Sequence, residues 1–151
     1  MKKLKWSHEF DTGIDVIDQQ HKRIVDYINA LRIAQGKGDR GAVGKTLVDL
    51  IAYTQAHFSF EEALMEDAGY DQIHVHKLTH QLFFGRVVLL QERFISGENV
   101  TQDLHDLLMG WLIDHIKGED QDYVGAVKEK MVGVVVDQKR RKSLLARFFG
   151  A

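Results

Sequence analysis

The chain has 151 residues, 44% of them apolar and 28% charged, with a formal net charge of -2. Its size and composition are typical of one globular domain with a hydrophobic core, and its charge gives no basis for a nucleic acid partner. Because the chain has no cysteine, disulfides, thiolate zinc sites, cysteine-ligated iron–sulfur clusters and a cysteine nucleophile are excluded. It has eight histidines, many for a small domain, and no proline.

The first residues contain several lysines around Trp6 but no apolar stretch, so we expect no signal peptide. No run of about 18 apolar residues occurs, so no membrane span is expected either. We therefore expect a cytoplasmic protein, with a peripheral position at the inner face of the membrane as the alternative.

Four stretches carry apolar residues at spacings of three and four, typical of helices with one buried face. In chain order they cover about 15–34, 40–67, 71–95 and 100–117. Glycines at the breaks, such as Gly69 and Gly97, are typical helix stops. The fold class predicted is all-α, an up-down-up-down antiparallel four-helix bundle with an N-terminal arm at 1–14 and a C-terminal helical tail.

Polar residues interrupt the apolar stripe of each predicted helix. In chain order they are His21, then His57 and Glu61, then His76 and His80, and finally His115. A buried imidazole or carboxylate is costly unless it is paired or binds a metal. Five histidines and a glutamate from four helices meet in one thin core, so they need a common partner, and a metal centre is that partner.

The spacing within the second and third helices suits such a centre. Residues four apart on a helix differ by about 40° and lie about 6 Å apart, so both can reach one ion. His57 and Glu61 form one such pair, and His76 and His80 form the other. Either pair alone is a weak signal, whereas the joint pattern over four stripes is strong.

The fourth helix offers His115 and, five residues later, Asp120. Five residues correspond to about 140° on a regular helix, too far for one face. We expect the helix to end or distort near Gly118, so that Asp120 turns back to the centre.

The combined pattern of His, His-x3-Glu, His-x3-His and His-x4-Asp resembles the hemerythrins, specifically their bacterial single-domain form. Trp6, the Asp-Gln-Gln-His run at 18–21, the doubled glutamate at 61–62 and Trp111 four residues before His115 are also similar to that family. The resemblance covers roughly residues 5–125.

The resemblance implies two iron ions bridged by Glu61, Asp120 and an oxo or hydroxo group, with O2 as ligand. The implied metal ligands are His21, His57, Glu61, His76, His80, His115 and Asp120. The last three histidines would hold one iron and the first two the other, which keeps an open position. On the residues alone, imidazole and carboxylate ligands suit iron or manganese and do not choose the metal.

The implied function is reversible O2 binding for carriage, storage or delivery, without enzymatic activity. Azide and nitric oxide are expected as further ligands, and Phe58, Trp111 and Leu112 are expected to wall the open site. Three alternatives use the same centre: sensing of O2 or nitric oxide, iron handling, and enzymatic turnover of peroxide or nitric oxide.

We divide the chain into a di-iron bundle at 1–125 and a basic amphipathic tail at 126–151. In the tail, four apolar residues are expected to share one helical side: Leu144, Leu145, Phe148 and Phe149. The tail either packs on the bundle or docks, through 137–151, on an anionic membrane surface or an O2-using partner protein.

Several other residues are interpreted as playing no direct part in metal binding. Trp6 is predicted to be a packing anchor for the arm, and Glu62 to lie behind the centre or in solvent. Three histidines are predicted to lie on the surface: His8, His74 and His105.

Overall fold

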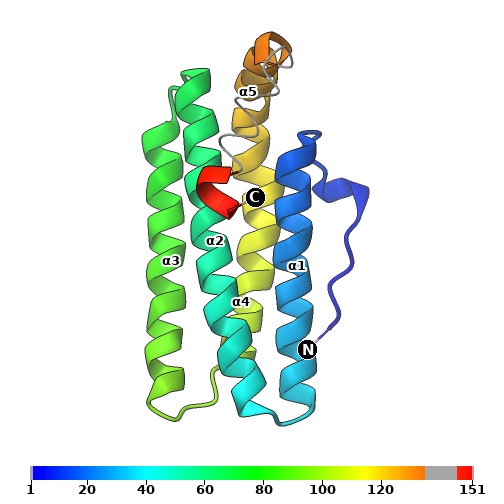
Figure 1. Ribbon diagram of the computed structural model, residues 1–151, viewed down its shortest axis with the longest axis vertical. Coiled ribbons are helices and arrows are strands. Elements are labelled where there is room, and N and C mark those ends of the chain that lie inside the picture. The colour runs from blue at the N-terminus through cyan, green and yellow to red at the C-terminus, as the bar shows by residue number, and fades with distance from the viewer. Residues whose placement is uncertain (1, 135–145, 151) are drawn as a thin grey trace.

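The computed structural model describes residues 2–134 and 146–150, and in this part of the chain the regular elements are all helical. Four long antiparallel helices stand side by side, which confirms the predicted all-α four-helix bundle (Figure 1). In chain order the elements are η1 (His8–Phe10), α1 (Asp15–Gly36), α2 (Arg40–Ala68), α3 (Ile73–Ile95), α4 (Thr101–Asp114), η2 (His115–Glu119) and α5 (Asp120–Val134).

Local side-chain chemistry sets the ends of α2. Asp39 caps its start, because the Oδ1 atom accepts a hydrogen bond from the backbone N–H of Ala42 at 2.9 Å. Gly69 ends it with φ of 65° and ψ of 37°, a left-handed conformation that glycine adopts without strain. The predicted stops at glycines are therefore confirmed here.

The fourth helix differs from its prediction. It was expected to stop near residue 117, but the chain passes through the π-helical turn η2 into α5 and stays helical to Val134. Gly118 does not act as a stop, because its φ is not positive. The buried stripe instead continues through Tyr123, Val124 and Val127. The helix α5 passes through residue 125 without a break. The division of the chain into a bundle and a tail at that residue stays a prediction.

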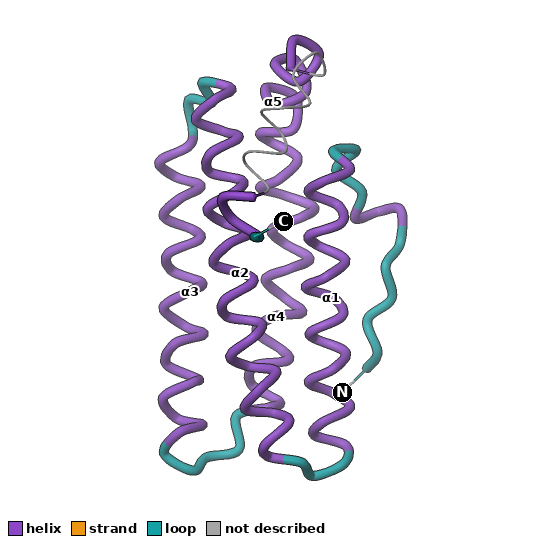
Figure 2. Tube along the Cα trace, in the orientation of Figure 1, coloured by secondary structure: helices purple, strands orange, loops and turns teal. Residues whose placement is uncertain are grey.

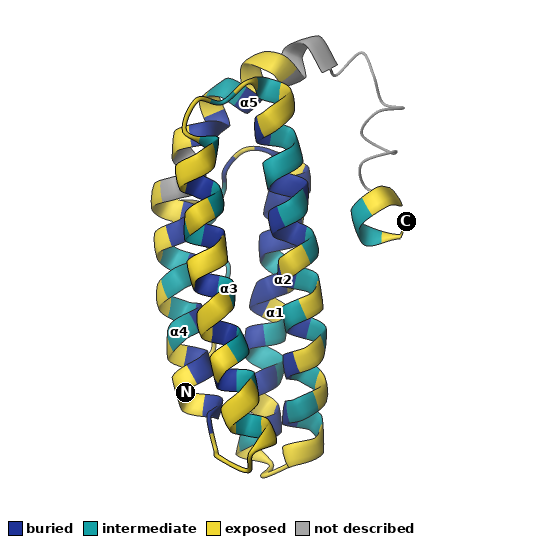
Figure 3. Cartoon of the chain, turned by 90° about the vertical axis from the view of Figure 1, so that its left-hand side faces the viewer, coloured by how far each residue is buried: buried dark blue, intermediate teal, exposed yellow. Residues whose placement is uncertain are grey.

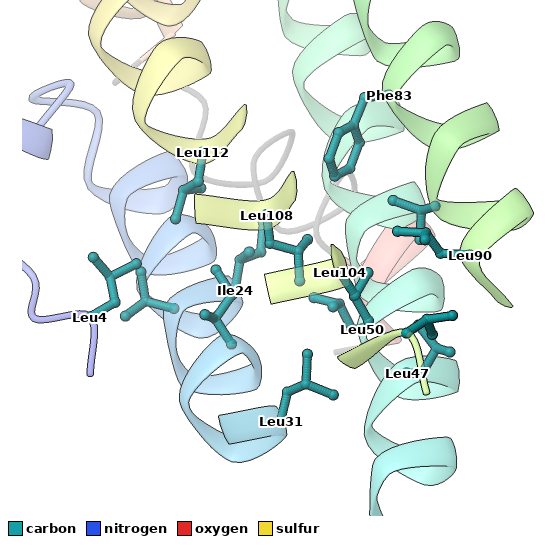
Figure 4. Packing of buried hydrophobic residues seen from close by; sticks show 14 of the residues in the cluster. Leu4, Ile24, Leu31, Leu47, Leu50, Phe83, Leu90, Leu104, Leu108 and Leu112 are labelled. Carbon is teal, nitrogen blue, oxygen red and sulfur yellow. The ribbon is translucent and has the colours of Figure 1, made fainter. Parts of the chain in front are cut away.

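Two apolar clusters fill the bundle, and Figure 3 marks the buried residues along each helix in dark blue. The larger one, called here the leucine half, includes Leu31, Leu47, Leu50, Leu90 and Leu104 and lies toward the α1–α2 and α3–α4 connections (Figure 4). The smaller one, called here the upper cluster, is built from eight buried residues: Ile14, Val16, Ile17, Phe60, Met65, Tyr123, Val124 and Val127. Along every helix, the polar residues predicted to face the core fall between the two clusters.

The N-terminal arm runs back along α1 (Figure 2). The Asn29 side chain pairs with the backbone of Leu4, accepting from its N–H at 3.0 Å and donating to its carbonyl at 2.9 Å. At the other end of the arm, the carboxylate of Asp18 accepts from the hydroxyl of Thr12 at 2.7 Å. Trp6 is half-buried against the leucine half, which confirms its role as a packing anchor.

Two of the three histidines predicted to lie on the surface do so, and one does not. His8 and His74 are exposed, as predicted. His105 is only 4% exposed, so that prediction is wrong. Its Nε2 lies 3.3 Å from the carbonyl oxygen of Lys2, because the arm covers this turn of α4. Its polar neighbours in sequence point to solvent and gave the misleading signal.

The segment 146–150 lies against α2, where it forms a short helical turn (Figure 1). The ring of Phe149 is 5.4 Å from that of Tyr53 and 5.8 Å from that of Phe60, so this part of the tail packs on the bundle. Leu144 and Leu145, predicted to share its apolar side, lie outside the described residues. No described helix combines the length and the apolar character that a bilayer span requires.

Candidate metal centre

Glu61 stands at the middle of a buried ring of histidines, and its side chain is 0% exposed. Its Oε1 lies 3.2 Å from the Nε2 of His57 and 3.4 Å from that of His21. Its other oxygen, Oε2, lies 3.3 Å from the Nε2 atoms of His80 and His115 and 3.9 Å from that of His76. One carboxylate therefore faces two histidines on one side and three on the other.

The ligand-type atoms form two overlapping groups, each with all its atoms within 4.8 Å of one another. Both groups contain Glu61 and His115; the first adds His21 and His57, and the second adds His76 and His80. All six residues are buried. The structure thus brings together six of the seven residues predicted from the sequence, which come from α1, α2, α3 and the turn η2 that follows α4. We call these six the histidine layer.

Regular helical periodicity positions the layer residues of α1, α2 and α3, whereas a distortion follows α4. In α2 and α3 the paired residues are one turn apart and share a face. After α4, the turn η2 forms i→i+5 hydrogen bonds, which bring residues five apart toward one face. That supplies the predicted change of direction between His115 and Asp120. The side chain of Asp120 is outside the described atoms, and its role as a ligand stays a prediction.

Two polar side chains orient the ring nitrogens from behind. The Nδ1 of His57 lies 2.7 Å from the Oε1 of Gln20, and that of His80 lies 2.9 Å from the Oε1 of Glu62. Because amide and carboxylate oxygens accept, Nδ1 carries the proton in both rings, and Nε2 keeps its lone pair toward the centre. Glu62 was predicted to lie behind the centre or in solvent, and the structure shows the first of these positions.

Tyr123 is a site residue that the sequence interpretation missed. It is fully buried on α5, and its hydroxyl donates to the Oε1 of Glu61 at 3.0 Å. Its position was assigned to the end of the bundle and the start of the tail, so no site role was considered. The signal that could have found it is the apolar stripe, which continues past Gly118 with one residue that carries a hydroxyl.

Burial and charge set the pKa values of three groups in the layer, and they favour an ionised Glu61 and a neutral His57. Desolvation by burial lowers the pKa of His57 to about 4, against the opposing attraction of Glu61. Burial alone would raise the pKa of Glu61, but the charges of His57 and His115 outweigh it and hold the pKa of that carboxyl well below its usual range. Burial likewise acts to lower the pKa of His80, but the neighbouring carboxylates of Glu61 and Glu62 outweigh burial and raise that pKa. A carboxylate with deprotonated imidazole is the form in which such groups bind a cation.

Aromatic rings flank the three-histidine side. Phe58 stacks on His80 with ring centroids 3.8 Å apart and 9° between the planes. Trp111 stacks on His115 at 4.2 Å and 18°. Leu112 is buried in the leucine half. Phe58 and Trp111 were expected to wall the open position beside His21 and His57, but they stack on His80 and His115, on the other side of Glu61. The His21 side is approached by Trp6, with ring centroids 6.4 Å apart.

Comparison with known proteins agrees with this geometry. The family model described as the hemerythrin HHE cation binding domain matches residues 12–127. A bacteriohemerythrin of Pseudomonas paraeruginosa is 44% identical over 99% of this chain and 100% of its own length. A bacteriohemerythrin of Methylococcus capsulatus is 37% identical over 82% of this chain and 95% of its own. A crystal structure of wild-type hemerythrin superposes with a TM-score of 0.79 at 34% identity, covering 83% of this chain and 98% of that one.

The chain belongs to the hemerythrin family, which confirms the resemblance inferred from its histidine pattern. The family's description as cation binding is consistent with a buried layer of five imidazoles around one carboxylate.

Proposed function

We propose that this protein binds O2 reversibly at a non-haem di-iron centre held in the histidine layer. The observation that carries the proposal is the division of the layer by Glu61, with two histidines at one carboxylate oxygen and three at the other. That division suits a pair of ions sharing one bridging carboxylate, with one ion less fully surrounded by protein ligands.

The donor set fits iron. Imidazole and carboxylate ligands without thiolate are those of non-haem iron proteins. In this proposal His76, His80 and His115 would hold one ion, His21 and His57 would hold the other, and Glu61 and Asp120 would serve both. A pair of ferrous ions held there would supply the two electrons needed for reversible O2 binding.

The described side chains orient and enclose the centre. Gln20 and Glu62 fix the tautomers of His57 and His80, so that the metal-binding nitrogens face inward. Tyr123 holds one oxygen of Glu61 by a hydrogen bond. Phe58 and Trp111 shield two of the rings, and every histidine of the layer is at most 5% exposed. A dry, rigid surrounding supports retention of a bound small molecule over its turnover.

We assign the protein to O2 carriage, storage or delivery in the cytoplasm, with azide and nitric oxide as further ligands of the open position. Sensing of O2 or nitric oxide, iron handling and enzymatic turnover use the same residues and differ in the fate of the bound molecule or metal. Docking of the tail on a membrane surface or an O2-using partner remains a separate hypothesis about residues 137–151.

The deciding experiment is to reduce the purified protein without air, admit O2, and monitor the visible spectrum together with iron analysis. Two irons per chain, with a charge-transfer band that forms with O2 and disappears under vacuum, would support reversible binding. Immediate irreversible oxidation would favour sensing or enzymatic chemistry. Absence of iron, or another metal in its place, would contradict the O2 proposal and leave only a metal site.

A further inference from the structure

An apolar stripe runs along the exposed face of α3. Four large side chains form it, called here the outer stripe, and each is more than half exposed: Val75 at 62%, Leu78 at 53%, Leu82 at 64% and Leu89 at 61%. Figure 3 is turned toward this helix and shows its exposed residues in yellow. A single exposed apolar residue is common on a protein surface, whereas several that share one helix face form a patch, and such a patch marks an interaction site.

The spacing of the outer stripe is that of a seam between two helices. Together with Gly85, its residues follow one another at intervals of three, four, three and four. This is the a/d pattern of a coiled coil, which keeps a narrow line of side chains facing a partner helix. The buried face of α3, with Phe83, Val87 and Leu90, already packs in the leucine half. The helix therefore has two apolar faces, and the described bundle buries one of them.

Gly85 lies within this pattern, and the described part of the chain gives no reason for a glycine there. Its φ is not positive, and an added Cβ would meet no atom within 4 Å. Glycine inside a helix is destabilising relative to alanine. The close approach of a helix from outside the chain would explain the missing side chain. It would also use the gap, which leaves room for an apolar side chain between Leu82 and Leu89.

The two ends of the outer stripe have complementary shapes. Val75 and Leu78 project at its amino end. Beside its carboxyl end, between α3 and α4, lies a groove of about 500 Å³, and Leu89, Leu90 and Leu107 line it. Two identical faces fit together when the helices are antiparallel, because the projecting end of each then lies over the groove of the other. Contact between identical patches is the two-fold, isologous arrangement of most dimers.

The charges around this groove allow such a contact. Its charged lining residues are two of each sign: Arg86 and Arg93 are basic, and Glu92 and Asp103 are acidic. The guanidinium of Arg93 donates to the carboxylate of Asp103 at 3.1 Å. Since the two signs balance, this face can meet an identical face without the repulsion that a strongly charged surface would cause.

We propose that the outer stripe is the surface through which two copies of this chain associate, as an antiparallel pair of α3 helices with the two-fold axis at Leu82. Leu82 is central in the stripe, so it would pack against Leu82 of the second copy, and Val75 would lie against that copy's Leu89. The histidines of α3, His76 and His80, are on its buried face and take no part. The association therefore stands or falls independently of metal and of O2 binding.

The size of the stripe predicts a weak dimer. Val75 and Leu89 are 14 residues apart, which corresponds to about 21 Å along a helix that is about 10 Å wide. A contact of this size is smaller than the roughly 800 Å² per partner of a standard stable interface. We therefore expect a dissociation constant between about 1 μM and 1 mM.

Sedimentation velocity of the purified, iron-loaded protein over that range of concentration is the first test. The average mass should rise from that of one chain toward that of two. Leu82→Lys brings two like charges together at the axis, so it should weaken association at least about a hundredfold. Val48→Lys is the matched control, because Val48 is 56% exposed on α2, outside the stripe, and should leave association unchanged.

Both variants should keep the iron content and helical circular dichroism of the wild type. A chain that keeps the mass of one copy throughout the range overturns the proposal, and would leave the stripe to a different protein or to the tail. Equal association of the wild type and Leu82→Lys would also overturn it, because the contact would then lie elsewhere.

Single cysteines test the geometry, since the chain has none of its own. Leu82→Cys should form a disulfide-linked dimer on mild oxidation, because its sulfur would lie at the axis. Leu89→Cys should not, because its two copies would be about 21 Å apart, beyond the reach of a disulfide. A mixture of Leu89→Cys and Val75→Cys should cross-link again. Cross-linking of Leu89→Cys alone as readily as Leu82→Cys would refute the antiparallel arrangement.

Discussion

The leucine half and the histidine layer are built on the same four helices and are buried to the same degree, yet they are completed in different ways. In the leucine half, residues such as Leu47, Leu50 and Leu104 are at most 1% exposed. Their side chains carry no polar group, so packing against one another is all that their burial requires. In the layer, His21 and Glu61 are 0% exposed, and their polar atoms must be matched by charge. Burial alone therefore does not show which part of a bundle is stable without a bound ion. One part stabilises the fold by itself, and the other is completed by a cation.

The largest expected effect comes from Glu61→Gln, which keeps the shape of the side chain and removes its charge. Since Glu61 belongs to both ligand groups, we expect the purified variant to lose both metal ions, as measured by iron per chain. The chain should still fold, because the leucine half is untouched, and circular dichroism should report a helical protein. Retention of one iron would show that the two groups are less dependent on the shared carboxylate than its position indicates.

The converse substitution is Leu104→Ala, in the centre of the leucine half. Leu104 is 0% exposed, so the change leaves a cavity and should lower the free energy of unfolding by about 2–5 kcal/mol. Denaturant titration of the metal-free protein measures it, and iron content after purification should stay that of the wild type. Loss of iron would mean that the two regions are coupled and that the comparison between them fails.

Glu62→Gln sharpens the comparison inside the histidine layer. The Nδ1 of His80 would still find an oxygen, but a neutral one, so the ring is held less firmly. We expect metal affinity to fall about tenfold, at the low end of such effects, measured by competition with a chelator. Glu66→Gln, on an exposed turn of the same helix, is the control and should leave the affinity unchanged. Equal effects of both variants would indicate a general charge effect in place of positioning.

The smallest effect is expected from Gly118→Ala within η2. A Cβ there would meet no atom within 4 Å, and Gly118 does not have a positive φ, so alanine fits the π-helical turn. We expect unchanged iron content and a gain in stability of less than about 1 kcal/mol, from the smaller entropy of the unfolded chain. Thermal unfolding of the iron-loaded protein would measure it. A loss of metal would instead show that the glycine itself makes the distortion.

The sequence alone predicts the parts of the molecule that obey simple periodicity. The stripes of apolar residues place the four helices, and their polar interruptions place Glu61 and the five histidines that surround it. The π-helical turn η2 shifts the helical register by one residue. The spacing of apolar residues before Asp120 does not predict this shift. Tyr123 was missed for the same reason, since the buried stripe was assumed to stop at Gly118. His105 was wrong because its burial depends on the arm, which contacts α4 from a hundred residues away in sequence.

The shared position of Glu61 and His115 has a consequence for how the centre is filled. An ion entering either group would fix the orientation of side chains that the other group also needs. The second ion would then meet ligands already in place and lose less conformational freedom on binding. Loading is therefore expected to be cooperative, so that a partly supplied preparation contains mainly fully loaded and empty molecules, with few chains carrying a single ion.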